Sequence, residues 1–171
     1  QKIQTSGALA IIVPRHPQRF NEVAELLKSD QIAFQRRSEN AAIAPSTRVV
    51  LGDSMGEMFA YFAASDVAFI GGSLLPLGGQ NLIEACAVGT PVLIGPHTFN
   101  FAEATDQAIT CGAAKRVAGA SELAQEIDQL LANPAQRKSM AAAGLAFTAA
   151  HRGASARAYE RVSSLLAQPG S

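Results

Sequence analysis

The feature that most constrains the fold of this chain is a regular alternation of short apolar runs with longer segments of helical pattern. The apolar runs, which are strand candidates, lie at residues 8–13, 32–36, 48–51, 67–70, 92–94 and 115–117. Segments with helical spacing lie at 17–28, 55–64, 80–88, 99–111 and 121–132, and two more helices, broken near Gly153, are expected to close the chain. Such alternation favours a parallel sheet with helical crossovers. An α/β fold is therefore predicted, with a Rossmann-like parallel sheet flanked by helices.

Length and composition indicate one compact body. The chain has 171 residues, of which 48% are hydrophobic and 16% charged, as in ordinary globular domains. Residues 1–171 are therefore predicted to form a single Rossmann-like domain, with carboxyl-terminal helices over 135–171. No apolar run reaches the length of a membrane span. Cys86 and Cys111 fit no metal or redox spacing, so reduced thiols are expected. No cofactor is expected.

Charge is unevenly spread along a chain whose formal net charge is zero. Residues 135–171 hold one acid, Glu160, and five basic side chains: Arg137, Lys138, Arg152, Arg157 and Arg161. A solvated helix face is the commoner explanation, and contact with an anionic membrane surface is the other. Because these charges are spread along the segment, no nucleic-acid binding is predicted.

Ligands of parallel α/β sheets bind outside the carboxyl ends of the strands, so each predicted strand end is a place to look for a site. After the first strand, Arg15 and His16 stand at the corner before Pro17, which suits the first turn of a helix. The planar guanidinium of Arg15 is suited to clamp a phosphate or carboxylate, although a surface ion pair explains it equally well. His16 is expected to cap or pack rather than to act as an acid or base.

The third predicted strand is followed by a helix-start signal. Ser54 with Glu57 three residues later has the spacing of a capping box, in which the two side chains bond the first amides of the helix. A helix start at this edge also leaves spare N–H groups that face the crevice. Met55 and Gly56 are placed to line a flat base.

A glycine-rich stretch, GGSLLPLGGQNLIEA at 71–85, follows the fourth strand. Gly71 and Gly72 come directly after the strand, and Gly78 and Gly79 precede the next helical pattern. Glycines let the backbone approach a ligand closely. The amides of Gly78, Gly79 and Gln80, taken as the start of the helix, are therefore predicted to bind an anion.

A carboxylate follows these glycines. Asn81 and Glu84 are three residues apart and so share one helix face. With the helix starting at Gln80, Glu84 lies one turn inside it, too far in to act only on the helix dipole. Its two oxygens are suited to accept hydrogen bonds from a ribose diol, whereas an ion pair with a nearby arginine is the plainer alternative. The loop after the fifth strand adds His97 and Asn100 at the same end of the sheet.

Four motifs together carry a resemblance to a known family. They are Pro-Arg-His-Pro at 14–17, Gly-Asp-Ser-Met-Gly-Glu at 52–57, Gly-Gly-Ser-Leu with Gly-Gly-Gln-Asn and Glu-Ala within 71–85, and Gly-Pro-His-Thr-Phe-Asn-Phe at 95–101. In this order they resemble the donor half of the bacterial 3-deoxy-D-manno-octulosonic acid (Kdo) transferases, which are glycosyltransferases of the two-domain GT-B type. The resemblance runs from about residue 11 to 117. One departure is Gln80, where family members often have histidine.

The resemblance implies transfer of Kdo from CMP-Kdo to a lipid A precursor in lipopolysaccharide biosynthesis, with inversion and without a metal. It implies a peripheral enzyme at the cytoplasmic face of the bacterial inner membrane. The donor nucleotide would be bound by Arg15, His16, Ser54, Met55, Gly56, Gly71, Gly72, Ser73, Gly78, Gly79, Gln80, Asn81 and Glu84. His97 and Asn100 would approach the donor sugar.

The family's catalytic base lies in an amino-terminal domain, and its carboxyl-terminal domain begins with strands that precede the start of this chain. The chain is thus expected to be a fragment, the carboxyl-terminal half of a GT-B enzyme without its first strands, and to be inactive alone. Two alternatives stay open. A sugar-nucleotide epimerase of similar fold would use a uracil nucleotide, which a comparison of CMP with UMP would detect. The other is a non-catalytic nucleotide-binding module.

Overall fold

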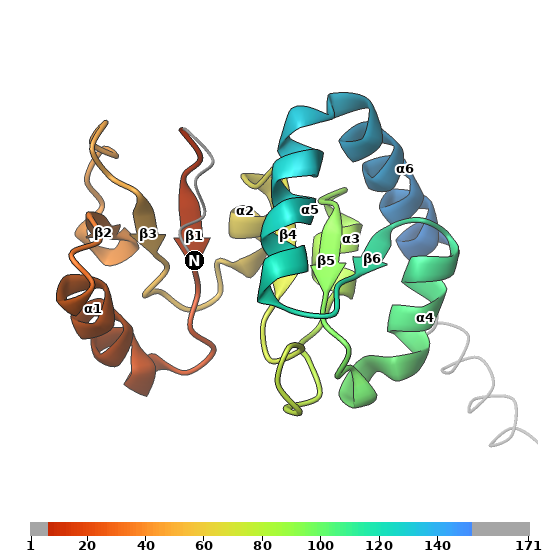
Figure 1. Cartoon of the computed structure of the whole chain (residues 1–171), viewed down its shortest axis with the longest axis horizontal. Coiled ribbons are helices and arrows are strands. Elements are labelled where there is room, and N and C mark those ends of the chain that lie inside the picture. Colours follow the sequence, from red (N-terminus) through yellow and green to blue (C-terminus); the bar gives the residue numbers. More distant parts are fainter. Residues whose placement is uncertain (1–6, 152–171) are drawn as a thin grey trace, which may run out of the picture. The chain divides into compact units, whose positions relative to one another are not determined.

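The computed structural model describes residues 7–151 and divides the chain into two compact units, Gln1–Ala64 and Ser65–Ser171. Within the described residues each unit has a parallel sheet of three strands flanked by helices (Figure 1). The predicted α/β class with parallel strands is therefore confirmed. That residues 1–171 form one domain stays a prediction. Among residues 7–151, no helix combines the length and apolar character needed to cross a membrane.

The first unit is built around one buried strand. Its elements are β1 (Ala10–Ile12), the 3-10 turn η1 (Pro17–Arg19), α1 (Phe20–Ser29), β2 (Phe34–Arg36), the 3-10 turn η2 (Arg37–Glu39), β3 (Val49–Leu51) and α2 (Met58–Ala63). The strand order is β1-β3-β2, and all three residues of β3 are buried. Apolar residues on both faces make β3 the central strand, as parallel sheets require. The register places Ile12 and Arg36 on either side of Leu51, at the carboxyl edge.

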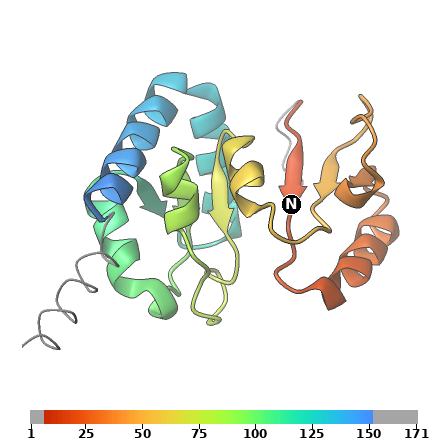
Figure 2. The ribbon, with the colours of Figure 1, turned by 180° about the vertical axis from the view of Figure 1, so that it is seen from behind.

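The second unit has consecutive strands joined by helices. Its elements are β4 (Ala68–Ile70), α3 (Ile83–Ala87), β5 (Val92–Ile94), the 3-10 turn η3 (Phe99–Phe101), α4 (Ala102–Thr110), β6 (Ala114–Arg116), α5 (Ala120–Ala132) and α6 (Pro134–His151). The strand order is β4-β5-β6. Figures 1 and 2 show α5 on one face of this sheet and α3 and α4 on the other. The register aligns Ile70, Ile94 and Arg116, so the loops that follow β4 and β5 leave the same edge.

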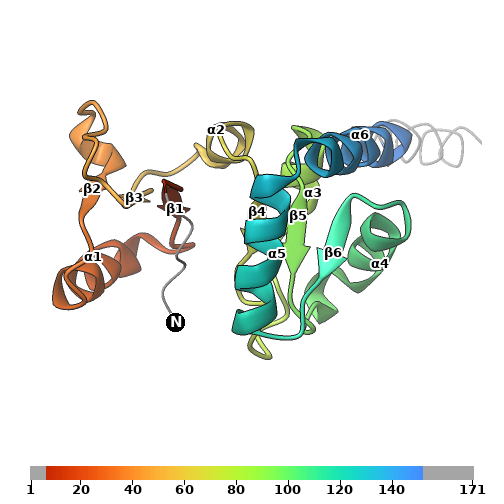
Figure 3. The ribbon, with the colours of Figure 1, turned by 45° about the horizontal axis from the view of Figure 1, so that its top comes forward.

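The core of the second unit lies between the sheet, α5 and α6. Leu93 of β5 packs with Val117, Leu130 and Met140, all of them buried. α6 also lies alongside α3, the helix on the other face of the sheet (Figure 3). The two helices come close because Gly144 has no side chain: a Cβ there would lie 3.2 Å from the backbone oxygen of Cys86.

Each predicted strand among residues 7–151 forms within two residues of its expected bounds. The helix starts were less accurate: the helix expected from Gln80 begins at Ile83, and the one expected from Met55 begins at Met58. The predicted break near Gly153 lies outside the described residues.

The basic carboxyl-terminal segment is described only in part. Arg137 Nη1 donates to the backbone oxygens of Leu130 (2.6 Å) and Leu131 (2.7 Å), and its Nε lies 3.5 Å from Asp66 Oδ1. This arginine therefore satisfies the carbonyls at the end of α5. Lys138 is exposed. The other basic residues of the segment, Arg152, Arg157 and Arg161, lie outside the described residues.

Candidate functional site

The loops that follow β4 and β5 are joined through a buried serine. Ser73 Oγ donates to the backbone oxygen of Ile70 (2.5 Å) and accepts from the N–H of Gly95 (2.8 Å). Gly95 is required here, because a Cβ would lie 2.3 Å from the backbone oxygen of Ser73. The hydroxyl of Ser73 is thus used within the fold and the residue is fully buried. This geometry gives no support to the predicted contact of Ser73 with a nucleotide.

The glycine-rich loop closes on itself before α3 begins. Gly72, Gly78 and Gly79 all have positive φ, a conformation that favours glycine. The N–H of Gly79 donates to the backbone oxygen of Gly72 (3.1 Å). The prediction that the amides of Gly78, Gly79 and Gln80 form a helix start is therefore wrong, since α3 begins at Ile83 and the Gly79 amide is already bonded. The approach of Gly71, Gly72 and Gly78 to a ligand stays a prediction.

Asn81 and Glu84 form a hydrogen-bonded pair at the start of α3. Asn81 Oδ1 accepts from the N–H of Ile83 (3.0 Å), and its Nδ2 donates to Glu84 Oε1 (3.1 Å). Glu84 is the second residue of α3 and half-buried, so the premise that it lies one turn inside the helix, too far in to act only on the helix dipole, is wrong. The first turn of a helix favours a carboxylate.

An ion pair of Glu84 with an arginine was the plainer explanation of this carboxylate. Within residues 7–151 the structure contains no ion pair of Glu84, so that alternative has no support. A carboxylate has about four acceptor positions. The bond from Asn81 therefore orients the group and leaves capacity for two ligand hydroxyls.

The loop after β5 lies against the glycine-rich loop. The N–H of His97 donates to the backbone oxygen of Ser73 (2.9 Å). Asn100 is held twice: its N–H donates to the oxygen of Gly78 (3.2 Å) and its Nδ2 to the oxygen of Leu77 (3.3 Å). Gly78 admits Asn100 because a Cβ at Gly78 would lie 2.3 Å from Asn100 Nδ2. The structure thus brings His97 and Asn100 to the glycine-rich loop. The backbone N–H and the side-chain NH₂ group of Asn100 both donate to that loop.

Arg116, at the end of β6, holds the first half of this loop and was missed at the sequence level. Its Nη1 donates to the backbone oxygens of Gly95 (3.1 Å) and Pro96 (3.4 Å) and to Thr98 Oγ1 (3.4 Å). Its Nη2 donates to Asp106 Oδ1 on α4 (3.1 Å). The strand expected at 115–117 placed Arg116 inside the strand, whereas β6 ends at Arg116, so inspection of the predicted strand ends did not reach it.

In the first unit, Arg15 and His16 follow β1 and are exposed. His16 precedes η1, and its backbone oxygen accepts from the N–H of Arg19 (2.9 Å), but its side chain makes no capping bond. His16 is thus the N-cap residue of η1, as one of the two expected roles has it, although it caps through its backbone and not its side chain. Its backbone turn, with Pro17 next, starts the helical segment as predicted.

The capping box expected at 54–57 does not form. The hydroxyl of Ser54 donates to the carboxylate of Glu57 and lies 2.7 Å from Tyr61 Oη, while Arg37 Nη2 donates to Glu57 Oε1 (3.0 Å). The hydrogen bond from Ser54 and the charge of Arg37 lower the pKa of Glu57, against the effect of burial. The two residues bond each other because α2 begins only at Met58, after Glu57.

The corner before α2 leaves an apolar side chain in solvent. Met55 is 66% exposed, and Gly56 has a φ of +81°. Met55 is therefore free to contact a flat ring. The predicted contacts of Ser54, Met55 and Gly56 with a base stay predictions.

A second polar cluster ties the ends of β2 and β3. Asp53 accepts from Ser38 Oγ (2.7 Å), from the N–H of Ser38 (2.8 Å) and from Arg36 Nη1 (3.3 Å). Its side chain is only 3% exposed. Burial alone would raise the pKa of Asp53, but the bonds from Ser38 and Arg36 outweigh burial and lower it.

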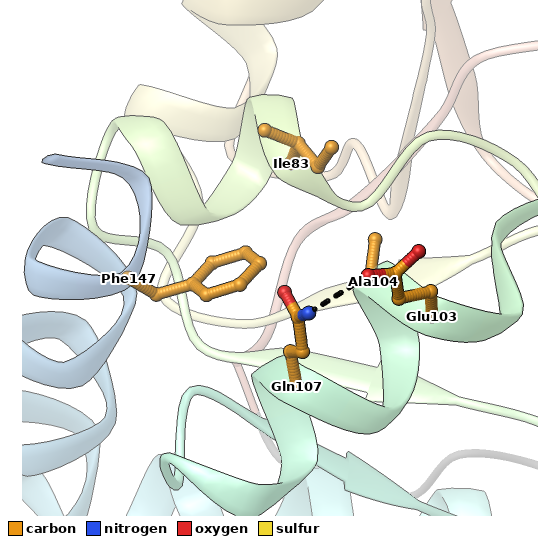
Figure 4. A pocket seen from close by; sticks show the side chains of 5 residues that line it. All are labelled: Ile83, Glu103, Ala104, Gln107 and Phe147. Carbon is orange, nitrogen blue, oxygen red and sulfur yellow. Dashed lines mark hydrogen bonds between the residues drawn. The ribbon is translucent and has the colours of Figure 1, made fainter. Parts of the chain in front are cut away.

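Two cavities of the second unit lie beside the predicted site residues, not among them. One, of about 250 Å³, lies between α3, α4 and α6 and is lined by Ile83, Glu103, Ala104, Gln107 and Phe147 (Figure 4). In it Gln107 Nε2 donates to Glu103 Oε1 (3.2 Å). Gln107 and Phe147 also line a neighbouring hollow between α4 and α6. Within residues 7–151, no three side chains of metal-ligating type are grouped.

Comparisons with known proteins point to one family. The family model of the glycosyl transferases group 1 matches residues 8–146. A 3-deoxy-D-manno-octulosonic acid transferase of Bordetella pertussis is 50% identical over 163 residues, which are 95% of this chain and 38% of that protein. One of Haemophilus influenzae is 42% identical over 147 residues, which are 85% of this chain and 34% of that protein. The chain thus spans less than half of either relative.

A solved structure resembles the chain as well. The carboxyl-terminal CMP-Kdo binding domain of WaaA from Acinetobacter baumannii matches with a TM-score of 0.74 and 37% identity, covering 81% of this chain and 72% of that one. The match supports the predicted relation to the carboxyl-terminal domain of a GT-B enzyme. The chain therefore belongs to the glycosyl transferases of group 1 and is a relative of the 3-deoxy-D-manno-octulosonic acid transferases.

Proposed function

We propose that this chain is the donor-binding part of a Kdo transferase. In the full protein it would present CMP-Kdo for transfer to a lipid A precursor in lipopolysaccharide biosynthesis, with inversion and without a metal. The relatives named above are transferases, and the similar domain of WaaA is described as binding CMP-Kdo. Both favour the transferase over the epimerase.

The observation that carries the proposal is the Asn81–Glu84 pair at the start of α3. Asn81 occupies one carboxylate oxygen of Glu84 at 3.1 Å and so fixes the orientation of the group. The 2′ and 3′ hydroxyls of a ribose are two adjacent donors, which suit a carboxylate that still has acceptor capacity. Hydrogen bonds to a charged group are stronger than neutral ones. The pair is therefore proposed to select a ribonucleotide.

The proposed roles of the other site residues come from the family resemblance. The backbone of Gly71, Gly72 and Gly78 would approach the phosphate, while Met55 and Gly56 would cover the cytosine. Arg15 would offset the donor's negative charge. His97 would approach the Kdo sugar, and so would Asn100, through its Oδ1, because its Nδ2 donates to Leu77.

The proposed chemistry is stabilisation of a leaving group. Transfer of Kdo releases CMP, so negative charge grows on the phosphate oxygen as the glycosidic bond breaks. Fixed backbone N–H groups and a guanidinium stabilise such charge without reorganising. The base that activates the acceptor is proposed to lie outside this chain, in an amino-terminal domain. The lipid acceptor also suggests a peripheral enzyme at the cytoplasmic face of the inner membrane.

The test uses the full-length protein that contains this chain. Calorimetric titration is expected to give a lower Kd for CMP than for UMP, and CMP-Kdo with a lipid A precursor is expected to give transfer. Residues 1–171 alone are expected to give none. A preference for UMP would favour the epimerase, and binding of CMP without transfer would favour a binding module. Turnover by residues 1–171 alone would refute the placement of the base.

A further inference from the structure

Arg116 connects three elements at the carboxyl edge of the second sheet. It is the last residue of β6 and pairs in register with Ile94, the residue before Gly95. Its neighbour Lys115 points to the other face, where its Nζ lies 2.7 Å from Glu126 Oε1 on α5. Arg116 points toward α4 and meets Asp106 there. Alternation along β6 therefore places the guanidinium of Arg116 on the α4 face of the sheet. The register places it beside the point where the chain leaves β5.

The guanidinium binds the loop more than it binds α4. Three of its contacts reach oxygens of residues 95–98, at 3.1 to 3.4 Å, and one reaches α4. The pair with Asp106 is exposed, since the Asp106 side chain is 72% exposed, and exposed ion pairs contribute little. The planar fork of arginine meets several acceptors at once, whereas the point charge of lysine does not.

The two ends of the loop are held by different side chains. Arg116 donates to oxygens of residues 95–98, and Ser73 accepts from the N–H groups of Gly95 and His97. Asn100 is held by the glycine-rich loop, through Leu77 and Gly78. The Asn81–Glu84 pair has no contact with Arg116 among these bonds. Loss of Arg116 would then loosen His97 and leave the proposed ribose contact in place.

We propose that Arg116 is a positioning residue for the donor sugar. It fixes residues 95–98 so that His97 meets the Kdo part of CMP-Kdo, and it makes no contact with the nucleotide. This inference rests on the proposed function, because it needs CMP-Kdo as the donor. It predicts that Arg116 matters for CMP-Kdo and not for CMP.

The experiment compares Arg116→Met and Arg116→Lys with wild type in the full-length protein. The KM for CMP-Kdo is expected to rise about tenfold in both variants, because each loses one or two of the charge-assisted hydrogen bonds that hold residues 95–98. The Kd of CMP is expected to change less than about twofold, because the Asn81–Glu84 pair is untouched. Asp106→Asn is the matched control: it removes the charge of the exposed partner, keeps the three loop contacts, and is expected to behave as wild type.

The outcomes separate this inference from the proposed function. Wild type that binds no CMP would refute the proposed function. If wild type binds CMP and the Arg116 variants raise the Kd of CMP and the KM for CMP-Kdo equally, only the positioning role is refuted. Wild-type behaviour of Arg116→Lys, or loss in Asp106→Asn equal to that in Arg116→Met, would refute it too. Melting curves check folding, and variants that are both unfolded at the assay temperature would show Arg116 to be structural.

Discussion

Replacing Glu84 with glutamine tests the centre of the proposed site. The change keeps the size of the side chain but removes its charge and replaces one acceptor oxygen with a donor NH₂ group. Asn81 Nδ2 donates to Glu84 Oε1 at 3.1 Å, so the remaining oxygen of the glutamine is expected to stay with Asn81. Its NH₂ group would then face the ligand, where a hydroxyl that donated before must accept.

The magnitude follows from this loss of a charged acceptor. Hydrogen bonds to charged groups contribute about 1.5–3 kcal/mol, and less where water competes. Glu84 is half-buried, so a loss of about 1–3 kcal/mol is expected, which is roughly 5- to 150-fold in Kd. CMP has both ribose hydroxyls and 2′-deoxy-CMP lacks one. Wild type is therefore expected to prefer CMP, and Glu84→Gln is expected to prefer it less.

The assay titrates both nucleotides against both proteins at one salt concentration, in the full-length protein. The four affinities give the coupling energy between the carboxylate and the 2′ hydroxyl. Glu103→Gln is the matched control, because Glu103 also stands in the first turn of a helix and accepts from a side-chain amide, that of Gln107 at 3.2 Å. It is expected to leave the preference unchanged. A folded Glu84→Gln protein with an undiminished preference for CMP would show that Glu84 has a structural role only.

Three further predictions concern the fold around the candidate site. Gly95→Ala is expected to lower the free energy of unfolding by about 1–3 kcal/mol, because a Cβ there would meet backbone atoms at 2.3 Å, while Gly71→Ala has open space; similar losses in urea denaturation would contradict this. Cys111 is exposed, whereas burial raises the pKa of Cys86 to about 11, so a thiol reagent at about pH 8 is expected to label Cys111 first. Peptide mass spectrometry measures this, and equal labelling would count against it. The pKa of Asp53 is lowered in the folded protein, below an unfolded value of about 3.9. Its stabilising effect is therefore complete above that pH and lost as the pH falls through the folded pKa. Asp53→Asn is expected to reduce the difference in unfolding free energy between about pH 5 and about pH 3, and an unchanged difference would disprove the assignment.

The strands were predictable because burial leaves a strong trace in the sequence. Val49-Val50-Leu51 and Val92-Leu93-Ile94 are buried on both faces and so form continuous apolar runs. Which strands pair is not encoded in any one run. The orders β1-β3-β2 and β4-β5-β6 depend on contacts between distant segments. The sequence therefore predicted a parallel α/β protein without predicting its strand order.

The errors in the candidate site come from side chains with more than one possible partner. Ser54 and Glu57 have the spacing of a capping box, yet they bond each other and Glu57 also bonds Arg37. Short-range spacing cannot reveal Arg37, which lies twenty residues earlier. Arg116 was missed for the same reason: its role depends on the register of β6 beside β5, and its sequence neighbours give no sign of it.

The motifs that carry the family resemblance contain two kinds of residue. Ser73 and Gly95 let the loops after β4 and β5 touch, since the Ser73 hydroxyl bonds Gly95 and a larger residue at Gly95 would meet the backbone of Ser73. The Ser73 hydroxyl and the Gly95 N–H therefore already have hydrogen-bond partners within the fold. Glu84 and His97 differ, because each is held by one partner while part of its side chain reaches the surface. A motif residue is therefore a better ligand candidate when the fold orients it without using all of its hydrogen-bonding groups, and by that criterion Glu84 is the residue to test first.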